Sequence, residues 1–230
     1  NGDQIVRKLL PGSHVTRYGQ AAKPNERIAG ESVPHLFSSY GFLDDSWFHR
    51  SYWVYNDVCS QRHGYSTTGR RAPAGRILVC DDENVYGFGR QKKYFAWTTP
   101  MEYRFFAEPK KGAIEKGVNR AVWEADATIL ASGLVLAGDT LFAAGAPDVL
   151  DETLPNVRGT DPAVTEAAKE QEAALAGDRG GKLVAFSKTD GSVAYQAELD
   201  APPVFDGLIA AAGRLYAVLK DGSVECWSGK

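Results

Sequence analysis

The sequence predicts an all-β protein built from short antiparallel strands, with a single helix inserted among them. Its composition is the first reason, because 24 glycines and 11% aromatic residues are typical of a β-rich chain with many tight turns. The second is that short apolar runs are separated by Asp-Gly and Gly-Asp dipeptides, which favour hairpin turns. The third is that these hairpin units recur at regular spacing in the second half of the sequence.

Composition also limits the function. The 230 residues carry a net charge of −3 without a long basic run, so the sequence has no electrostatic footprint for nucleic acid. No apolar run reaches the roughly 18 residues that a membrane-spanning helix requires. The start, NGDQIVRKLL, has neither an initiator Met nor the apolar segment of a signal peptide, which is typical of a processed chain or a fragment.

The strand pattern begins after Pro34. Apolar runs bounded by turn residues predict strands at 76–82, 84–90, 93–99, 102–108 and 119–126. The first two of these form a tight hairpin. Three later stretches predict strand pairs around turns, namely 133–145 at Gly138-Asp139, 181–199 at Asp190-Gly191, and 207–227 at Gly213 and Asp221-Gly222.

One segment predicts a helix. In DPAVTEAAKEQEAALAG (161–177), Asp161 is a suitable N-cap, Pro162 suits the first helical position and Gly177 is a stop signal. Its apolar residues are mostly Ala, so we expect a shallowly packed surface helix near 161–176, inserted between two strands.

The repeat sets the expected architecture. Gly138 aligns with Gly213, an offset of 213 − 138 = 75, and Gly181 aligns with Gly222, an offset of 222 − 181 = 41. The two offsets differ by 34 residues, about the length of the helical insertion. Without it both halves share a period near 41, the spacing of a four-stranded β-propeller blade. A single such sheet cannot bury both of its faces, so blades stack on one another.

We therefore expect a propeller-like array of four-stranded antiparallel blades over residues 35–230, with residues 1–34 as an N-terminal extension or partial blade. The stretches 35–75, 76–126, 127–200 and 201–230 give about three and a half units. A closed ring needs at least four. The array is then an incomplete ring, whose partners are other blades or another protein chain.

Residues 181–227, GKLVAFSKTDGSVAYQAELDAPPVFDGLIAAAGRLYAVLKDGSVECW, carry a family resemblance. The order of strand, Asp-Gly turn, strand, APPVFDG linker and closing DGSVECW strand resembles the Trp-docking, quinoprotein-like β-propeller repeats. That family includes alcohol dehydrogenases that use pyrroloquinoline quinone. The resemblance extends over roughly residues 35–227, and it implies a bacterial, exported protein in the periplasm or the cell envelope.

The resemblance leaves two functions open. The leading one is a non-catalytic binding or scaffold portion of an exported propeller protein. The alternative is part of a pyrroloquinoline quinone-dependent oxidoreductase with calcium, whose site is completed by blades outside this chain. Such enzymes are expected to contain a vicinal Cys pair, which this sequence lacks, and no Trp fills the docking position after TDGSVAYQAELD. We therefore transfer no cofactor residue to this chain.

The stretch HLFSSYGFLDDSWFHRSYWVYN (35–56) contains the candidate ligand-binding residues. These are acidic, basic or aromatic: Asp44, Asp45, Trp47, His49, Arg50 and Trp53. In one interpretation the charged groups form an acid/base site while the Trp rings stack on a planar ligand such as a quinone or a sugar. In the other, which we favour, Asp44-Asp45 is the turn of a hairpin and Arg50 pairs with an Asp of that turn.

Three other features have ordinary structural explanations. DDEN (81–84) has carboxylates that could bind calcium, but it lacks the ligand spacing of a known loop, so we favour turn chemistry. RHGYSTTGRR (62–71) could contact an anion or a partner, although a solvated loop is the default. Cys80 and Cys226 are expected to be small apolar core residues on strands.

Overall fold

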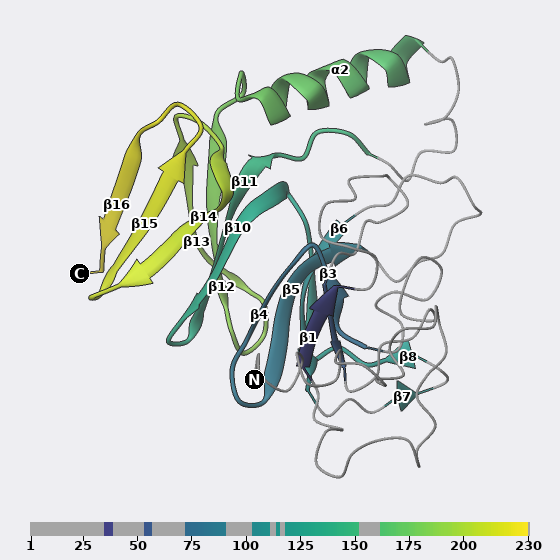
Figure 1. The fold of residues 1–230 in the computed structure, drawn as a ribbon. Helices are drawn as coiled ribbons and strands as arrows, with labels where there is room; N and C mark the ends of the chain where they lie inside the picture. The colour runs from purple at the N-terminus through teal and green to yellow at the C-terminus, as the bar shows by residue number, and fades with distance from the viewer. Residues whose placement is uncertain are drawn as a thin grey trace, which may run out of the picture.

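The computed structural model describes residues 35–38, 53–56, 72–90, 103–110, 114–115, 118–151 and 162–229. This part of the chain is mostly β, with one helix, so the predicted class is confirmed. The strands form antiparallel sheets that follow one another along the sequence (Figure 1). The described sheets do not close into a ring.

The N-terminal half contains two main sheets. Sheet A has three short strands, β1 (His35–Ser38), β2 (Trp53–Asn56) and β3 (Ala74–Gly75). Sheet B has four, β4 (Ile77–Cys80), β5 (Asn84–Arg90), β6 (Tyr103–Pro109) and β9 (Trp123–Asp126). A separate pair, β7 (Ile114–Glu115) and β8 (Val118–Asn119), lies between β6 and β9 in sequence.

The C-terminal half also contains two main sheets, in the reverse order of strand number. Sheet D has four strands, β10 (Ile129–Ala137), β11 (Thr140–Pro147), β12 (Gly181–Ser187) and β13 (Val193–Leu199). Sheet E has three, β14 (Pro203–Ala211), β15 (Arg214–Leu219) and β16 (Val224–Ser228). Each of the four sequence stretches expected to form one unit therefore contains one main antiparallel sheet, although the sheets of 35–75 and 201–230 have three described strands instead of the expected four.

Most of the predicted strands are present where the structure describes them. The hairpin of β4 and β5, the strand β6 and all three C-terminal strand groups match the sequence pattern. The run 119–126 is shorter than predicted, because β9 begins only at Trp123 and Asn119 belongs to β8. The predicted strand at 93–99 lies outside the described residues.

The helix α2 (Pro162–Ala176) confirms the predicted insertion. It begins at Pro162 and is followed by Gly177, as the capping pattern indicated, while Asp161 lies outside the described residues. Only Gln171 and Ala174 of the helix are buried, so its packing is shallow. The helix joins the second and third strands of sheet D and lies above that sheet in Figure 1.

The register corrects one detail of the predicted repeat. Leu141 pairs with Phe186 in sheet D, and Leu215 pairs with Trp227 in sheet E. The β10–β11 hairpin therefore corresponds to the β14–β15 hairpin with an offset of 215 − 141 = 74 rather than 75, because both connections have two residues. The third strands correspond with an offset of 227 − 186 = 41, as predicted.

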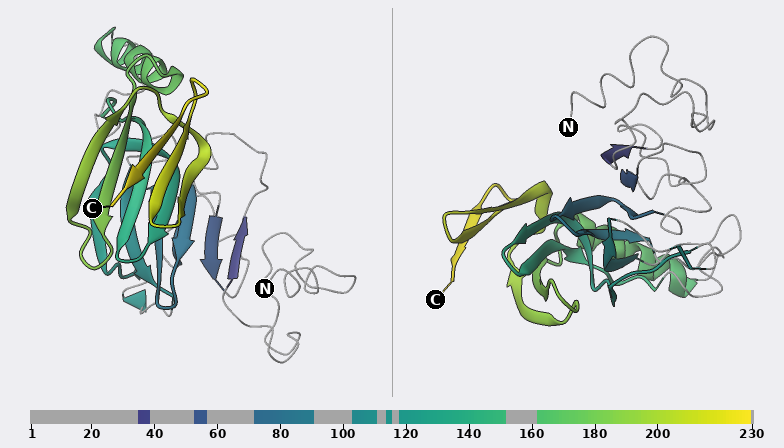
Figure 2. Two further views of the ribbon diagram at one scale, coloured as in Figure 1. Left: turned by 90° about the vertical axis from the view of Figure 1, so that its left-hand side faces the viewer. Right: turned by 90° about the horizontal axis from the view of Figure 1, so that it is seen from below.

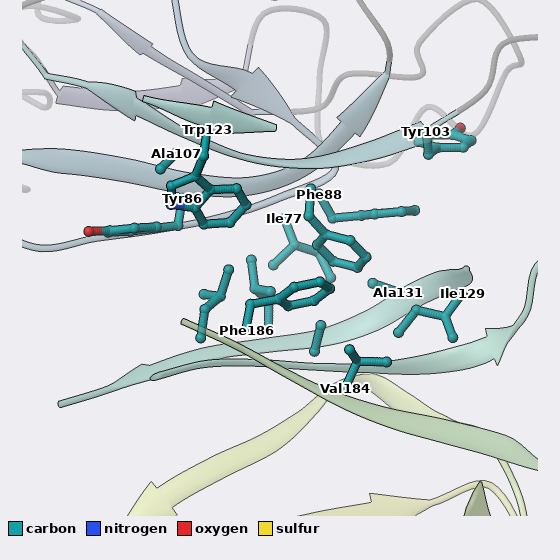
Figure 3. Packing of buried hydrophobic residues seen from close by; sticks show 14 residues of the cluster. Ile77, Tyr86, Phe88, Tyr103, Ala107, Trp123, Ile129, Ala131, Val184 and Phe186 are labelled. Atoms are coloured by element: carbon teal, nitrogen blue, oxygen red, sulfur yellow. The ribbon is translucent and has the colours of Figure 1, made fainter. Parts of the chain in front are cut away.

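Sheet D packs on a neighbouring sheet with each of its faces. A first core, drawn in Figure 3, joins sheet B to sheet D through residues such as Phe105, Trp123 and Phe186. A second core joins sheet D to sheet E through Leu183 and Leu215. Alternate residues of one strand serve the two cores, since Ala143 lies in the first and Ala144 in the second.

The first strands of successive sheets also lie close together. β10 contacts both β4 of sheet B and β14 of sheet E. The Ser132 hydroxyl on β10 donates a 2.9 Å hydrogen bond to the Pro203 carbonyl on β14. Sheets B, D and E therefore approach one another along one edge, and Figure 2 shows sheet E at the outer end of these three.

Of the described helical residues, none forms a segment that is long and apolar enough to span a membrane.

Candidate functional site

Only one predicted ligand-binding residue can be located. Trp53 lies half-buried on β2, where it pairs with Ser38 and Gly75. Asp44, Asp45, Trp47, His49 and Arg50 lie outside the described residues. β1 and β2 pair antiparallel, from His35 opposite Asn56 to Ser38 opposite Trp53. The turn expected at Asp44-Asp45 lies outside the described residues, so the hairpin interpretation stays a prediction.

The residues DDEN (81–84) form the turn between β4 and β5, at one end of sheet B. Asp81 Oδ1 accepts hydrogen bonds from the backbone amides of Glu83 and Asn84, at 2.9 and 2.8 Å. Its other oxygen accepts one from the Tyr86 hydroxyl at 3.0 Å. This confirms turn chemistry at 81–84, since the carboxylate is engaged by donors from its own turn.

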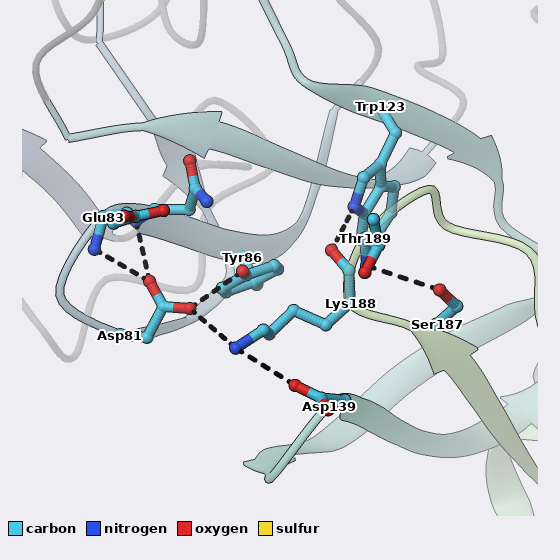
Figure 4. Close-up of polar contacts among 9 residues, drawn as sticks. Asp81, Glu83, Tyr86, Trp123, Asp139, Ser187, Lys188 and Thr189 are labelled. Carbon is cyan, nitrogen blue, oxygen red and sulfur yellow. Dashed lines mark hydrogen bonds and ion pairs between the residues drawn. The ribbon is translucent and has the colours of Figure 1, made fainter.

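A lysine connects this turn to sheet D (Figure 4). The Lys188 ammonium lies 3.5 Å from Asp81 Oδ2 and 3.5 Å from Asp139 Oδ1. Burial would raise the pKa of Asp81, but the amides of Asn84 and Glu83, the Tyr86 hydroxyl and Lys188 together lower it. Asp81 is therefore held as an anion that anchors two sheets, rather than as a proton acceptor.

Beside this ion pair, Trp123 of sheet B docks on the turn of sheet D. Its indole Nε1 donates a 2.8 Å hydrogen bond to the Lys188 carbonyl (Figure 4). A Cβ placed on Gly191 would lie 2.4 Å from Trp123 Cε3, so the ring lies directly against that glycine. Gly191 also has φ +73°, which other residues rarely adopt. Both constraints require glycine at this position.

A second polar cluster lies on the face of β6 that points away from the core between sheets B and D. Arg104 Nη2 and Glu108 Oε1 are 2.8 Å apart, and Asn119 Nδ2 donates a 2.6 Å hydrogen bond to Glu108 Oε2. Both members of the ion pair are buried, at 2% and 0% exposure. The Arg104 guanidinium also lies 4.3 Å from the centre of the Phe106 ring. Arg104 Nη1 also lies 3.3 Å from the half-exposed Glu124 carboxylate, so the arginine charge is shared between two acidic side chains. The cluster therefore has the character of a structural ion-pair network.

The register defines an equivalent row of side chains in each sheet. Along the first three strands, each row has a β-branched residue, an aromatic residue and a small residue, and in sheets B and D the fourth strand adds another aromatic residue. The rows are Val79, Tyr86, Ala107 and Trp123 in sheet B; Val135, Phe142, Ala185 and Tyr195 in sheet D; and Ile209, Tyr216 and Cys226 in sheet E.

The three rows differ in what covers them. The row of sheet B lies in the core against sheet D, and the first two residues of the sheet D row pack in the core against sheet E. Among the described residues nothing covers the row of sheet E, where Ile209 is 57% exposed. Val218 and Val224 are exposed on the same face. We call these five residues the outer face of sheet E: Ile209, Tyr216, Val218, Val224 and Cys226.

This arrangement corrects the prediction for the two cysteines. Cys80 and Cys226 do lie on strands, but both are exposed free thiols rather than core residues. Cys226 is equivalent to Ala185, which is only 2% exposed because sheet E lies over sheet D. Cys80 is the last residue of β4, next to the turn. Sequence alternation identified Cys226 as a small apolar residue of β16, but it did not show that no described sheet packs over it.

The described residues offer no set of ligands for the calcium that the alternative function requires. No three His, Cys, Asp or Glu side chains in this part of the chain are grouped as they would be around a metal ion. The loop 62–71 lies outside the described residues. We therefore derive no step through calcium or a quinone.

Comparisons with known proteins add no family to this picture. No family model matches the sequence, and no curated protein matches it. Among solved structures, the chain is similar to one described as the computationally designed Ika4 protein. The two share 11% sequence identity with a TM-score of 0.40, and the match covers 84% of this chain and 97% of the other. A similarity this weak carries no argument about function.

Proposed function

We propose that this chain is a binding or scaffold portion of a propeller-like protein, which joins a further β-sheet through the outer face of sheet E. The single observation that carries the proposal is the equivalence of the three rows. The rows of sheets B and D face a following sheet, whereas the row of sheet E is exposed. A face built like two covered ones is best explained as a face that is covered in the working assembly.

The chemistry of the outer face supports a protein partner. Its five residues are aliphatic, aromatic or thiol-bearing, and the exposed Arg214 lies beside them on the same face of β15. Contiguous exposed apolar surface on a folded protein commonly marks an interaction site. The neighbouring sheets indicate the complement, because each covered row meets the apolar face of another antiparallel sheet.

The relation between successive sheets supports the propeller-like arrangement. β4, β10 and β14 are the first strands of their sheets, and β10 contacts the other two. Trp123 of sheet B docks on the turn of sheet D, which is the kind of contact that a resemblance to Trp-docking repeats leads one to expect. Bacterial origin, export and a periplasmic or envelope location remain part of the proposal through that resemblance.

The proposal is tested by introducing a charge into the outer face. We expect the purified chain to self-associate as its concentration rises, because an exposed apolar face favours contact with another apolar surface. Ile209→Lys should abolish this association, whereas Val122→Lys, at an exposed apolar residue outside the outer face, should leave it unchanged. Light scattering measures the mass of each particle.

Two results would contradict the scaffold function. One is a wild-type chain that stays monomeric at every concentration and binds an apolar dye no better than Ile209→Lys does. The other is alcohol oxidation with an artificial electron acceptor after pyrroloquinoline quinone and calcium are added. The second result would favour the oxidoreductase alternative.

A further inference from the structure

Sheet E has one strand fewer than the sheets it resembles. Its third strand, β16, is equivalent to β12 of sheet D, since Trp227 and Phe186 occupy matching positions beside Leu215 and Leu141. A fourth strand, β13, pairs with β12, and β9 pairs with β6 in the same way in sheet B. Among the described residues no strand lies beside β16, which forms the edge of its sheet.

The hydrogen bonds of the preceding hairpin show which groups of β16 face this edge. Leu219 N donates a 2.9 Å hydrogen bond to the Ser223 carbonyl. Antiparallel pairs alternate between bonded and non-bonded, so Glu225 and Trp227 direct their amides toward β15. The amides and carbonyls of Val224, Cys226 and Ser228 consequently point away from β15, toward the edge. β16 contains neither Lys nor Pro, and its only charged residue is Glu225.

The Tyr195 side chain of sheet D, which lies beneath the open place beside β16, is also exposed. Tyr195 on β13 occupies the same place in its row as Trp123 on β9. Trp123 is only 7% exposed because the turn that leads into the fourth strand of sheet D lies against it, whereas Tyr195 is 52% exposed. The corresponding turn of sheet E would begin beside β16. Open backbone groups and an exposed aromatic ring therefore mark the same vacant place.

We propose that the free edge of β16 binds an extended strand of a partner polypeptide, which pairs antiparallel with it as the fourth strand of sheet E. Main-chain hydrogen bonds would come from Val224, Cys226 and Ser228. By analogy with Ala185 opposite Tyr195, the incoming strand places an aromatic residue opposite Cys226. The inference rests on the equivalence of the sheets that supports the proposed function, but it concerns the edge of sheet E and not its outer face.

The test uses a peptide whose sequence is the natural fourth strand of sheet D, SVAYQAEL (192–199), with a scrambled peptide of the same composition as the control. The protein is the 230-residue chain with Ile209→Lys, in which the outer face is blocked while the edge is intact. Amide hydrogen exchange is followed by NMR with increasing peptide. We expect exchange at Val224, Cys226 and Ser228 to slow by about tenfold or more, with little change at Glu225 and Trp227.

The alternating pattern distinguishes strand addition from docking on the outer face, which would not select every second amide. Cys226→Pro, which removes one outward amide, should weaken peptide binding by about tenfold, and Val224→Pro serves if the first variant does not fold. Three results would overturn the proposal: no alternating protection at millimolar peptide, equal protection by the scrambled peptide, or edge amides already protected in the free chain. In the last case a second copy or another part of this chain already occupies the edge.

Discussion

Trp123 and Lys188 are 65 residues apart in sequence, yet the indole Nε1 of the first donates a 2.8 Å hydrogen bond to the carbonyl of the second. The bond joins the last strand of sheet B to the turn between β12 and β13. The same turn carries the Lys188 ammonium to Asp81 and Asp139. One tight turn therefore holds the relative position of two sheets through its backbone and its side chain.

Gly191→Ala should destabilise the protein strongly. The new methyl group would meet the Trp123 ring at 2.4 Å, and φ of +73° would be strained for alanine. Overpacking of this kind costs about 1–3 kcal/mol. Gly213→Ala is the matched control, because φ is +72° there but no atom lies within 4 Å of the added carbon. Urea unfolding should show the larger loss for Gly191→Ala, and equal losses would contradict the docking contact.

Asp81→Asn should reduce stability at neutral pH and have progressively less effect in acid. The pKa of Asp81 is lowered in the folded protein, so its carboxylate stabilises the fold above the unfolded pKa near 3.8. This contribution is lost as the pH falls through the folded pKa, where the native carboxylate takes up a proton. Losing the charged acceptor of the Tyr86 hydroxyl and Lys188 should cost about 1–2 kcal/mol at neutral pH.

Denaturant unfolding of wild type and Asp81→Asn between pH 2 and 7 measures this difference. Asp139→Asn is the control at the more exposed partner of Lys188, where a much smaller effect is expected. A gap between wild type and Asp81→Asn that stays constant down to pH 2 would show that the carboxylate charge is not the stabilising feature.

Local sequence patterns predicted the strands and the helix because their causes are local. The Asp-Gly-Ser turns illustrate this point: Asp190 Oδ1 accepts hydrogen bonds from the amide and hydroxyl of Ser192, and Asp221 does the same with Ser223. Each turn is closed by residues two positions apart. The helix boundaries likewise follow from Pro162 and Gly177.

Contacts between sheets could not be predicted in this way. Nothing in the strand pattern around Trp123 indicates that its ring covers Gly191, because alternation gives the face of a strand and not the neighbour on that face. Exposure of Cys226 was missed for the same reason. Matching the rows from sequence alone requires the correct offset of 74 between sheets D and E. Aligning Gly138 with Gly213 gives 75 instead, because Gly138 is the first residue of its turn and Gly213 is the second.

Glu108→Leu should be among the most destabilising substitutions in the chain. It removes the carboxylate that lies 2.8 Å from the buried Arg104 guanidinium and leaves only the half-exposed Glu124 carboxylate, at 3.3 Å. Breaking one side of a buried ion pair costs about 3–5 kcal/mol, and Glu124 should offset part of that loss. The double variant Arg104→Met with Glu108→Leu removes both charges and should recover much of that loss. Thermal unfolding of both variants tests this, and a double variant less stable than Glu108→Leu would show that the arginine has a separate role.

Gln171→Leu should loosen the attachment of α2 to sheet D. The Gln171 Oε1 atom accepts hydrogen bonds from the amides of Val149 and Leu150, at 2.8 and 3.2 Å, while its Nε2 donates to the Pro147 carbonyl at 3.1 Å. Losing these partners should cost about 1–3 kcal/mol. Glu172→Leu, at an exposed position of the same helix, is the control. Limited proteolysis near 148–151 should accelerate in Gln171→Leu only, and equal rates would contradict the attachment.

Tyr86→Phe should change the response of the protein to alkali. Burial, with smaller effects from Asp81 and Glu83, raises the pKa of Tyr86 from 10.0 to about 12. Between these values the native state holds a proton that the unfolded state has released, so stability falls as the pH rises through that range. The shift corresponds to a loss of roughly 3 kcal/mol at most, and it is complete above about pH 12. The absorbance of ionised tyrosine should show a late-titrating group in the wild type that Tyr86→Phe lacks, whereas an unchanged late titration would place the perturbed group elsewhere.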